Sequence, residues 1–220
     1  MRRQRQLGQT RLQDKPPRAI TPRSKDILPF PLTASPKPKS SGPLGAESWT
    51  QAGLTILARN GIEAVRIERL AKVLGVTKGS FYWHFKDRPA LLDDMLRSWR
   101  QRATMGIIER IDRSEVPPAD RLKELLKLLR NSPRVSRGAD IEAAIRLWGR
   151  SDPRVASVVQ ELDRLRIAHT KTLVEAAHGV RPDSTARAIL IYAYILAEGW
   201  IGTTMDPEVC EQCESILEGL

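Results

Sequence analysis

The sequence predicts an all-α fold, and three observations support this. No segment of the 220 residues alternates apolar and polar side chains as a half-buried strand does. Apolar side chains instead recur every three or four residues, as in the series Leu122, Leu125, Leu126 and Leu129. Capping residues, prolines and glycines mark where successive helices begin and end.

The first half of the predicted fold contains four helices. The first begins in a capping box formed by Ser48 and Gln51 and ends at Asn60-Gly61. A short helix over residues 67–74 is closed by Gly75, and a third begins after Thr77 as its N-cap. Asp87 caps a long fourth helix that tolerates Pro89 in its first turn and contains Gly106. Its inward face carries Leu92, Met95, Leu96, Trp99 and Ala103.

The second half begins after the break at Val116-Pro117-Pro118. One helix is marked by the series Leu122, Leu125, Leu126 and Leu129. The next is marked by Ile141, Ala144, Ile145 and Trp148. Ser151-Asp152-Pro153 starts a long helix that ends near His178-Gly179, and Asp183 or Ser184 begins the penultimate one.

The penultimate helix is apolar on every side over residues 188–197. Such a helix must be buried on several sides, which a helix near a chain terminus does not easily achieve alone. A subunit interface is the natural solution, and an unusually buried monomer core is the alternative. This run of ten residues is far shorter than the ~20 that a membrane span needs.

Positive charge is concentrated in the first 46 residues. They hold ten Lys and Arg against two Asp, a difference of +8 in a chain whose net charge is +10, together with eight of the 15 prolines. Residues 1–46 are therefore predicted to form a disordered basic tail, which either adds phosphate contacts, has no role, or is not translated. No signal peptide is predicted, because Arg2, Arg3 and Arg5 precede no apolar run, and the chain is expected in the cytoplasm.

Residues 66–88 have the layout of a helix-turn-helix DNA reader: a short helix, a glycine turn and a second helix with aromatic and basic residues. At about 100° per residue, Phe81 and Phe85 fall within about 40° of each other and form the inward stripe. Tyr82 and Trp83 then lie on the outer side, where a DNA groove is accessible to them. The helix N-terminus after Thr77 favours a phosphate.

The segment Gly75-Val-Thr-Lys-Gly-Ser-Phe-Tyr-Trp-His-Phe resembles the DNA-binding signature of TetR-type bacterial repressors, and the resemblance extends back to residues 49–60 and forward through Pro89-Ala-Leu-Leu. It implies an N-terminal three-helix bundle over residues 47–90 and a C-terminal ligand-binding and dimerisation domain over residues 91–220. It further implies a homodimer formed by the last two helices, about residues 183–218, and release from a palindromic operator by a small-molecule effector.

Carried over by position, the resemblance also assigns contacts with double-stranded DNA. The expected base contacts are Lys78, Ser80, Tyr82 and Trp83, and Gly79 matches a backbone contact. The expected phosphate contacts are Thr77, His84, Lys86 and Arg88. The sequence departs from the family pattern at Arg66, where Ser or Thr usually begins the second helix, and at Glu68, where a base-reading Arg is frequent. Arg66 is able to reach phosphate, and Glu68 to accept from a cytosine amine.

The resemblance implies an effector pocket in the second domain, for which bulky residues on apolar helices are the candidates: Trp99, Met105, Trp148, His169 and Tyr192. His169 lies on an apolar stripe, so it either bonds an effector or has a protein partner. Cys210 and Cys213 would face the same way on a helix, and two chains together would supply four thiolates, but two small residues without a metal are the simpler interpretation. No metal, cofactor or catalytic site is predicted, because the three histidines are scattered and no nucleophile motif occurs.

The sequence therefore predicts a homodimeric, sequence-specific transcriptional regulator, with activation left open beside repression. A non-specific basic DNA-packaging protein that uses the N-terminal tail is the alternative from another class.

Overall fold

The computed structural model describes residues 45–130, 133–201 and 206–219, so all but the last two residues of the predicted tail lie outside the described part. The described residues form helices joined by short turns and contain no strand, which confirms the predicted all-α class. The described residues all belong to one compact unit. The predicted boundary between residues 90 and 91 stays a prediction.

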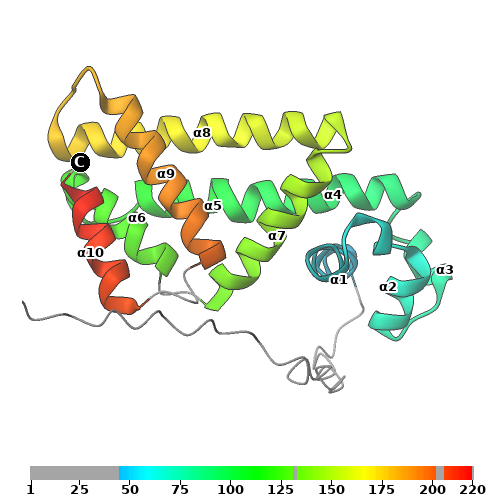
Figure 1. Cartoon of the computed structure of the whole chain (residues 1–220). Helices are drawn as coiled ribbons and strands as arrows, with labels where there is room; N and C mark the ends of the chain where they lie inside the picture. The colour runs from blue at the N-terminus through cyan, green and yellow to red at the C-terminus, as the bar shows by residue number, and fades with distance from the viewer. Residues whose placement is uncertain (1–44, 131–132, 202–205, 220) are drawn as a thin grey trace, which may run out of the picture. The chain divides into compact units, whose positions relative to one another are not determined.

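The first four helices match the predicted order. They are α1 (Ala46–Asn60), α2 (Ile67–Leu74), α3 (Lys78–Tyr82) and α4 (Arg88–Arg100), with a 3₁₀ turn (Ile62–Ala64) after α1. Figure 1 shows α1, α2 and α3 gathered at one end of α4. Asp87 caps α4 as predicted, since its Oδ1 accepts from the amide of Ala90 at 2.9 Å.

The prediction of a capping box at Ser48 is wrong. The helix begins at Ala46 with Gly45 as N-cap, and the amide of Ser48 already donates to the Gly45 carbonyl at 3.0 Å. Gln51 does not cap either, because its side-chain oxygen accepts from Arg102. The helix therefore begins two residues earlier than the capping box implies, and the Gln51 side chain bonds Arg102 instead of the helix start.

The predicted long fourth helix is interrupted. After α4 the chain forms a π-helical segment (Gln101–Met105, called the π segment below) and then α5 (Gly106–Asp112). Gly106 follows directly, and a Cβ added to it would lie 3.2 Å from the carbonyl oxygen of Gln101. Because this is closer than most Cβ contacts, a larger residue would strain the end of the π segment.

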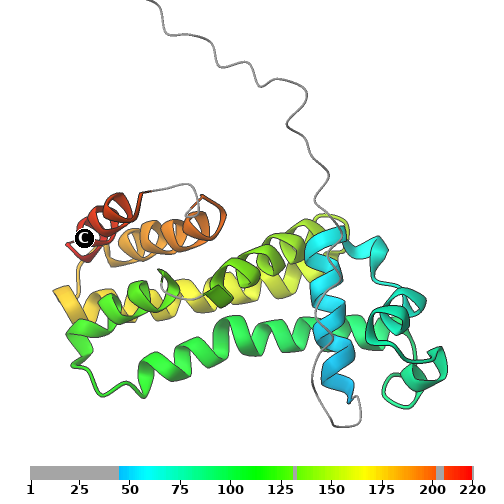
Figure 2. The same ribbon diagram turned by 90° about the horizontal axis from the view of Figure 1, so that it is seen from below.

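The second half begins with a 3₁₀ turn (Pro118–Asp120) after the predicted proline break. The following helices are α6 (Arg121–Arg130), α7 (Pro133–Gly149), α8 (Pro153–His178), α9 (Ser184–Ile201) and α10 (Pro207–Glu218). The long α8 runs beside α4 and α5 in both views (Figures 1 and 2), and Arg100 of α4 pairs with Glu161 of α8 at 2.6 Å. Helix α9 packs on α8, and α10 lies at the end of the unit opposite α2 and α3.

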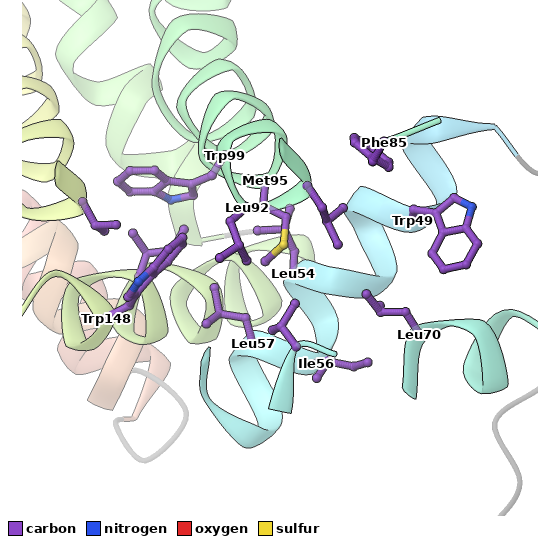
Figure 3. Close-up of a cluster of buried hydrophobic side chains, with 14 of the residues drawn as sticks. Trp49, Leu54, Ile56, Leu57, Leu70, Phe85, Leu92, Met95, Trp99 and Trp148 are labelled. Carbon is purple, nitrogen blue, oxygen red and sulfur yellow. The ribbon is translucent and has the colours of Figure 1, made fainter. Parts of the chain in front are cut away.

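One apolar core continues from the first three helices into the second half. It contains Trp49 and Leu57 of α1, Met95 and Trp99 of α4, and Trp148 of α7, all buried (Figure 3). A second cluster around Ile111, Leu126 and Ile191 joins α5, α6, α8 and α9. The N-terminal bundle is thus attached to α4 and α7 by packed side chains. No helix in the described residues is both long and apolar enough to cross a membrane.

Candidate functional site

The turn between α2 and α3 is fixed by one glycine. Gly75 has φ 71° and ψ 31°, the left-handed conformation that favours glycine, and its amide donates to the carbonyls of Ala71 and Lys72. Thr77 is the N-cap residue of α3 as predicted, with an extended backbone, but its hydroxyl makes no capping hydrogen bond. Thr77 is exposed at the start of α3.

The inner face of α3 is locked against α1 by aromatic rings. Phe81 is fully buried and meets Trp49 edge-on, with ring centroids 5.2 Å apart and planes at 76°. Phe85 stacks on Phe81 at 5.5 Å. Edge-on and offset contacts of this kind are favourable beyond the area that they bury. The predicted Phe81–Phe85 stripe is confirmed, and it holds a helix of only five residues in one orientation.

The outer face of α3 presents two large aromatic side chains to solvent. Tyr82 is 60% exposed and Trp83 is 88% exposed. Burying an aromatic side chain stabilises a folded protein, and Tyr82 and Trp83 contribute little of this stabilisation because they are exposed. Their positions therefore do not favour the stability of the isolated chain. Gly79 adds to this outer face, where an added Cβ would meet only the Thr77 hydroxyl at 3.6 Å. Packing within the chain therefore does not require a glycine at this position.

Two of the basic residues predicted to meet DNA are held by backbone carbonyls. Nε of Arg88 donates to Val65 O at 2.7 Å and its Nη2 to Ile62 O at 2.8 Å. Arg88 thus fastens the turn between α1 and α2 to the start of α4, a role that the sequence did not indicate. Nε of Arg66 donates to Glu63 O at 2.9 Å. Thr77, His84 and Lys86 are exposed, whereas Ser80 is half-buried.

Lys78, at the first position of α3, pairs with Glu68 near the start of α2. Nζ of Lys78 lies 2.6 Å from Oε1 of Glu68, and both side chains are more than half exposed, at 57% and 61%. The hydrogen bond from Lys78 is the main cause that lowers the pKa of Glu68. Glu68, at which the sequence departs from the family pattern, therefore forms an ion pair that joins α2 to α3.

The second half contains a polar network inside the helical packing. Arg166 of α8 lies at its centre: it donates to both carboxylate oxygens of Glu142 at 3.0 and 3.1 Å and to the Tyr192 hydroxyl at 3.2 Å. Nε1 of Trp99 donates to the same Glu142 carboxylate at 3.1 Å. The Arg166 guanidinium also lies over the Trp99 ring, 5.6 Å from its centroid. Helices α4, α7, α8 and α9 each supply one of these side chains.

Arg146 and Asp163 complete this network. Arg146 donates to both oxygens of Asp163 and to Glu142, and the Tyr192 hydroxyl donates to Asp163 at 2.6 Å. Burial raises the pKa of Tyr192 to about 12. Burial alone would raise the pKa of Asp163, but the hydrogen bonds from Arg146 and Tyr192 lower it. The network thus balances two guanidinium groups against two carboxylates.

The network and the first helix both bind the π segment. Arg166 donates to the carbonyl of Ala103 at 3.3 Å and to the Thr104 hydroxyl at 2.8 Å. Arg102, one residue earlier, reaches the other way and donates to Gln51 at 2.5 Å and Glu47 at 2.6 Å on α1. Single π turns inside α-helices frequently occur at functional sites. Here one turn connects the polar interior of the second half with α1.

Of the five predicted pocket residues, only Trp99 and Tyr192 meet in this network. Trp148 is buried in the apolar core, Met105 is half-buried at the end of the π segment, and His169 pairs with Asp112 of α5 at 2.9 Å. Two hollows, of about 690 and 480 Å³, are lined by other residues. They are Arg110, Val116, Asp120, Lys123, Glu124, Lys127 and Leu128 in the larger, and Asn60, Glu63, Ala64, Arg66, Glu68 and Arg69 in the smaller.

Sequence reasoning did not single out Glu142, Arg146, Asp163 and Arg166. The available signal was their spacing, since residues 142 and 146 and residues 163 and 166 each place opposite charges on one helix face. Most pairs with that spacing lie on exposed faces, so the pattern alone does not identify a buried network.

The last two helices leave apolar side chains uncovered. Ile189 and Leu190 of α9 are 47% and 56% exposed, and Val209 and Ile216 of α10 are 45% and 67% exposed. Of the apolar stretch over residues 188–197, the monomer buries Ala188, Ile191 and Tyr192 but leaves Ile189 and Leu190 exposed. Cys210 is buried and Cys213 half-buried, and among the described residues no group of three His, Cys, Asp or Glu side chains is placed to hold a metal.

Comparison with known proteins identifies this arrangement. Residues 50–95 match the sequence model of the bacterial regulatory proteins of the tetR family. The chain is 30% identical over 76 residues to the HTH-type transcriptional regulator AcrR of Shigella flexneri, and 40% identical over 50 residues to the class D tetracycline repressor of Escherichia coli. These matches cover 33% and 23% of this chain, and only 34% and 23% of the two relatives.

Residues 50–95 therefore form a DNA-binding region of the TetR type. A transcriptional regulator from Rhodococcus sp. Rha1 superposes on 80% of this chain and 95% of its own length, with a TM-score of 0.63 and 20% identity. At that identity the likeness shows the fold alone, and the shared fold reaches well beyond the matched residues 50–95. The residues that match the tetR-family model run from α1 to the middle of α4 and include all of α3.

Proposed function

We propose that this chain is a sequence-specific DNA-binding transcriptional regulator of the TetR type, that it acts as a homodimer in the cytoplasm, and that it is a repressor released by a small-molecule effector. The observation that carries the proposal is the outer face of α3. Tyr82 and Trp83 are exposed there while Phe81 and Phe85 lock the opposite face, so the exposure does not come from loose packing. Aromatic side chains held rigidly on a surface are typical of binding sites.

The proposed DNA contacts follow from this face. Lys78, Ser80, Tyr82 and Trp83 would meet base edges, and Thr77, His84 and Lys86 would meet phosphates. Gly79 would allow the backbone close to the duplex, since nothing in the chain requires a glycine there. Arg66 and Arg88 contribute mainly by shaping the turns around α2, because their guanidinium groups already hold carbonyl oxygens.

The proposed dimer forms through α9 and α10, within residues 183–218. Two symmetric copies would cover the uncovered apolar side chains of both helices, as obligate dimer interfaces do. The two α3 helices would then enter successive major grooves of a palindromic operator, roughly 34–36 Å apart.

The proposed effector acts at the polar network. Trp99 and Tyr192 hold Arg166 and Glu142 in place, and Arg166 in turn holds the π segment that connects to α1 through Arg102. An effector that took over hydrogen bonds of Arg166 would change the support of the π segment, and with it the placement of α1 to α3. Residues 91–220 are proposed as the regulatory part on this basis.

Selection from a randomised duplex library tests the proposed function. We expect the full chain to enrich a palindromic motif and to bind it at least about 10³-fold more tightly than a scrambled duplex at physiological salt. The DNA-packaging alternative, which the comparisons do not favour, predicts no enriched motif. A full chain that binds both duplexes equally well across a salt titration would refute sequence-specific regulation.

A further inference from the structure

The Glu68–Lys78 pair lies on the face of α3 that is proposed to meet DNA. Lys78 and Tyr82 are four residues apart on α3 and therefore lie on one side of that helix. Glu68 comes from α2, and its Oε1 is 2.6 Å from Nζ of Lys78. The pair thus presents a hydrogen-bond donor and an acceptor side by side, next to the exposed Tyr82.

Neither stability nor phosphate binding accounts for an acid at this position. Ion pairs that are more than half exposed contribute little to stability, because water screens them and both side chains must be ordered. A carboxylate beside Lys78 also cancels the charge that would attract a phosphate, and so weakens non-specific binding. A carboxylate that weakens binding to DNA of any sequence increases specificity if it binds one base better than the others.

The chemistry of the pair matches one base pair in the major groove. Guanine presents two acceptors, O6 and N7, and the N4 amine donor of its cytosine lies directly beside O6. An A·T pair presents adenine N7 and thymine O4 as acceptors, but the adenine N6 donor lies between them, so it offers a lysine no two adjacent acceptors. We propose that Lys78 and Glu68 read one G·C base pair in each half-site as a unit, with Lys78 donating to guanine O6 and N7 and Glu68 accepting from cytosine N4.

This assignment rests on the proposed DNA-binding function and deepens it. It makes Glu68 a specificity-determining residue. The lowered pKa of Glu68 is consistent with an ionised acceptor at neutral pH. Most affinity from Lys78 then depends on the correct base pair, because on other sequences Glu68 continues to neutralise it.

Library selection with three forms of the full chain tests the proposal: wild type, Glu68→Ala, and the control Glu63→Ala, which removes an exposed acid from the same bundle. We expect the wild-type motif to contain an invariant G·C pair in each half-site. Changing that pair to A·T should weaken wild-type binding by about 5- to 150-fold. The same change should weaken Glu68→Ala by less than about 3-fold, while Glu63→Ala behaves as wild type.

A salt titration on random duplex gives a second measurement. Freed from Glu68, Lys78 is expected to neutralise one phosphate, so the slope of log K against log salt should steepen by about one in Glu68→Ala. Replacing the guanine by inosine should leave wild-type binding unchanged, because inosine keeps O6 and N7 and lacks only the minor-groove amine.

The outcomes separate this inference from the proposed function. If wild type enriches no motif, the proposed function fails. If wild type enriches a motif and Glu68→Ala enriches the same one with the same discrimination, only the assignment of the pair is overturned. A large loss with inosine would also overturn it, since that result indicates minor-groove readout. Circular dichroism of both variants checks that the fold is intact.

Discussion

Removing Arg166 tests whether the polar network stabilises the second half of the chain. In Arg166→Met, Glu142 loses both of its hydrogen bonds from the guanidinium, and Thr104 and the carbonyl of Ala103 lose their donor. Breaking a buried ion pair costs about 3–5 kcal/mol, because a charge is left without compensation. Glu142 keeps Arg146 and Trp99 as partners, so we expect the lower end, a loss of about 3 kcal/mol in the free energy of unfolding.

Urea unfolding followed by circular dichroism measures this loss. All samples need one protein concentration, since a dimer's stability depends on it. Arg100→Met is the matched control: it removes an exposed pair with Glu161, with side chains 43% and 56% exposed, and should cost less than about 1 kcal/mol.

The double variant Glu142→Met with Arg166→Met separates burial of charge from loss of packing. Replacing both partners by apolar side chains removes the uncompensated carboxylate, so we expect stability within about 1 kcal/mol of wild type. The reasoning is refuted if Arg166→Met costs no more than Arg100→Met, or if the double variant is no more stable than Arg166→Met alone.

Three further predictions concern the other surfaces and the pH dependence. Trp83→Ala should weaken binding to the selected motif by about 1–3 kcal/mol and leave the urea midpoint unchanged, because the side chain is 88% exposed; a shifted midpoint would indicate a structural role instead. Leu190→Glu should convert the dimer to monomers in sedimentation at micromolar concentration, whereas Leu147→Glu, an exposed position on α7, should not. Because burial raises the pKa of Tyr192 to about 12, the unfolded chain releases this proton at lower pH than the folded chain does, and the free energy of unfolding should fall between about pH 10 and 12. Tyr192→Phe should lose that component of the pH dependence, and an identical slope in both proteins would contradict the pKa.

The sequence predicted the helix-turn-helix well because its signals are local. Gly75 needs a left-handed backbone, Asp87 caps its own helix, and Phe81 and Phe85 are four residues apart. These three features depend on residues that are close in the sequence, so they can be predicted without knowing how the helices pack. Ser48 shows the limit, since an equally local signal failed where Gln51 found a partner, Arg102, 51 residues away.

The C-terminal half was predicted less well because its contacts are between helices. Trp99 and Tyr192 were chosen for size, and they do lie together, but what brings them together is the Glu142–Arg166 pair between α7 and α8. Whether such a pair faces solvent or the interior depends on how the helices pack, which residue spacing does not specify. Met105, Trp148 and His169 lie elsewhere for the same reason.

The network has a consequence for how an effector would act. Its two guanidinium groups and two carboxylates are hydrogen-bonded to one another, so a ligand entering there replaces existing bonds and does not simply fill a void. Only a ligand that binds one arrangement of these groups better than another is able to shift the equilibrium between them. Arg166 is the residue through which such a difference would reach DNA, because the π segment that it holds also carries Arg102 on α1. A purely apolar ligand offers no substitute for those bonds, so the effector is expected to carry polar groups of its own.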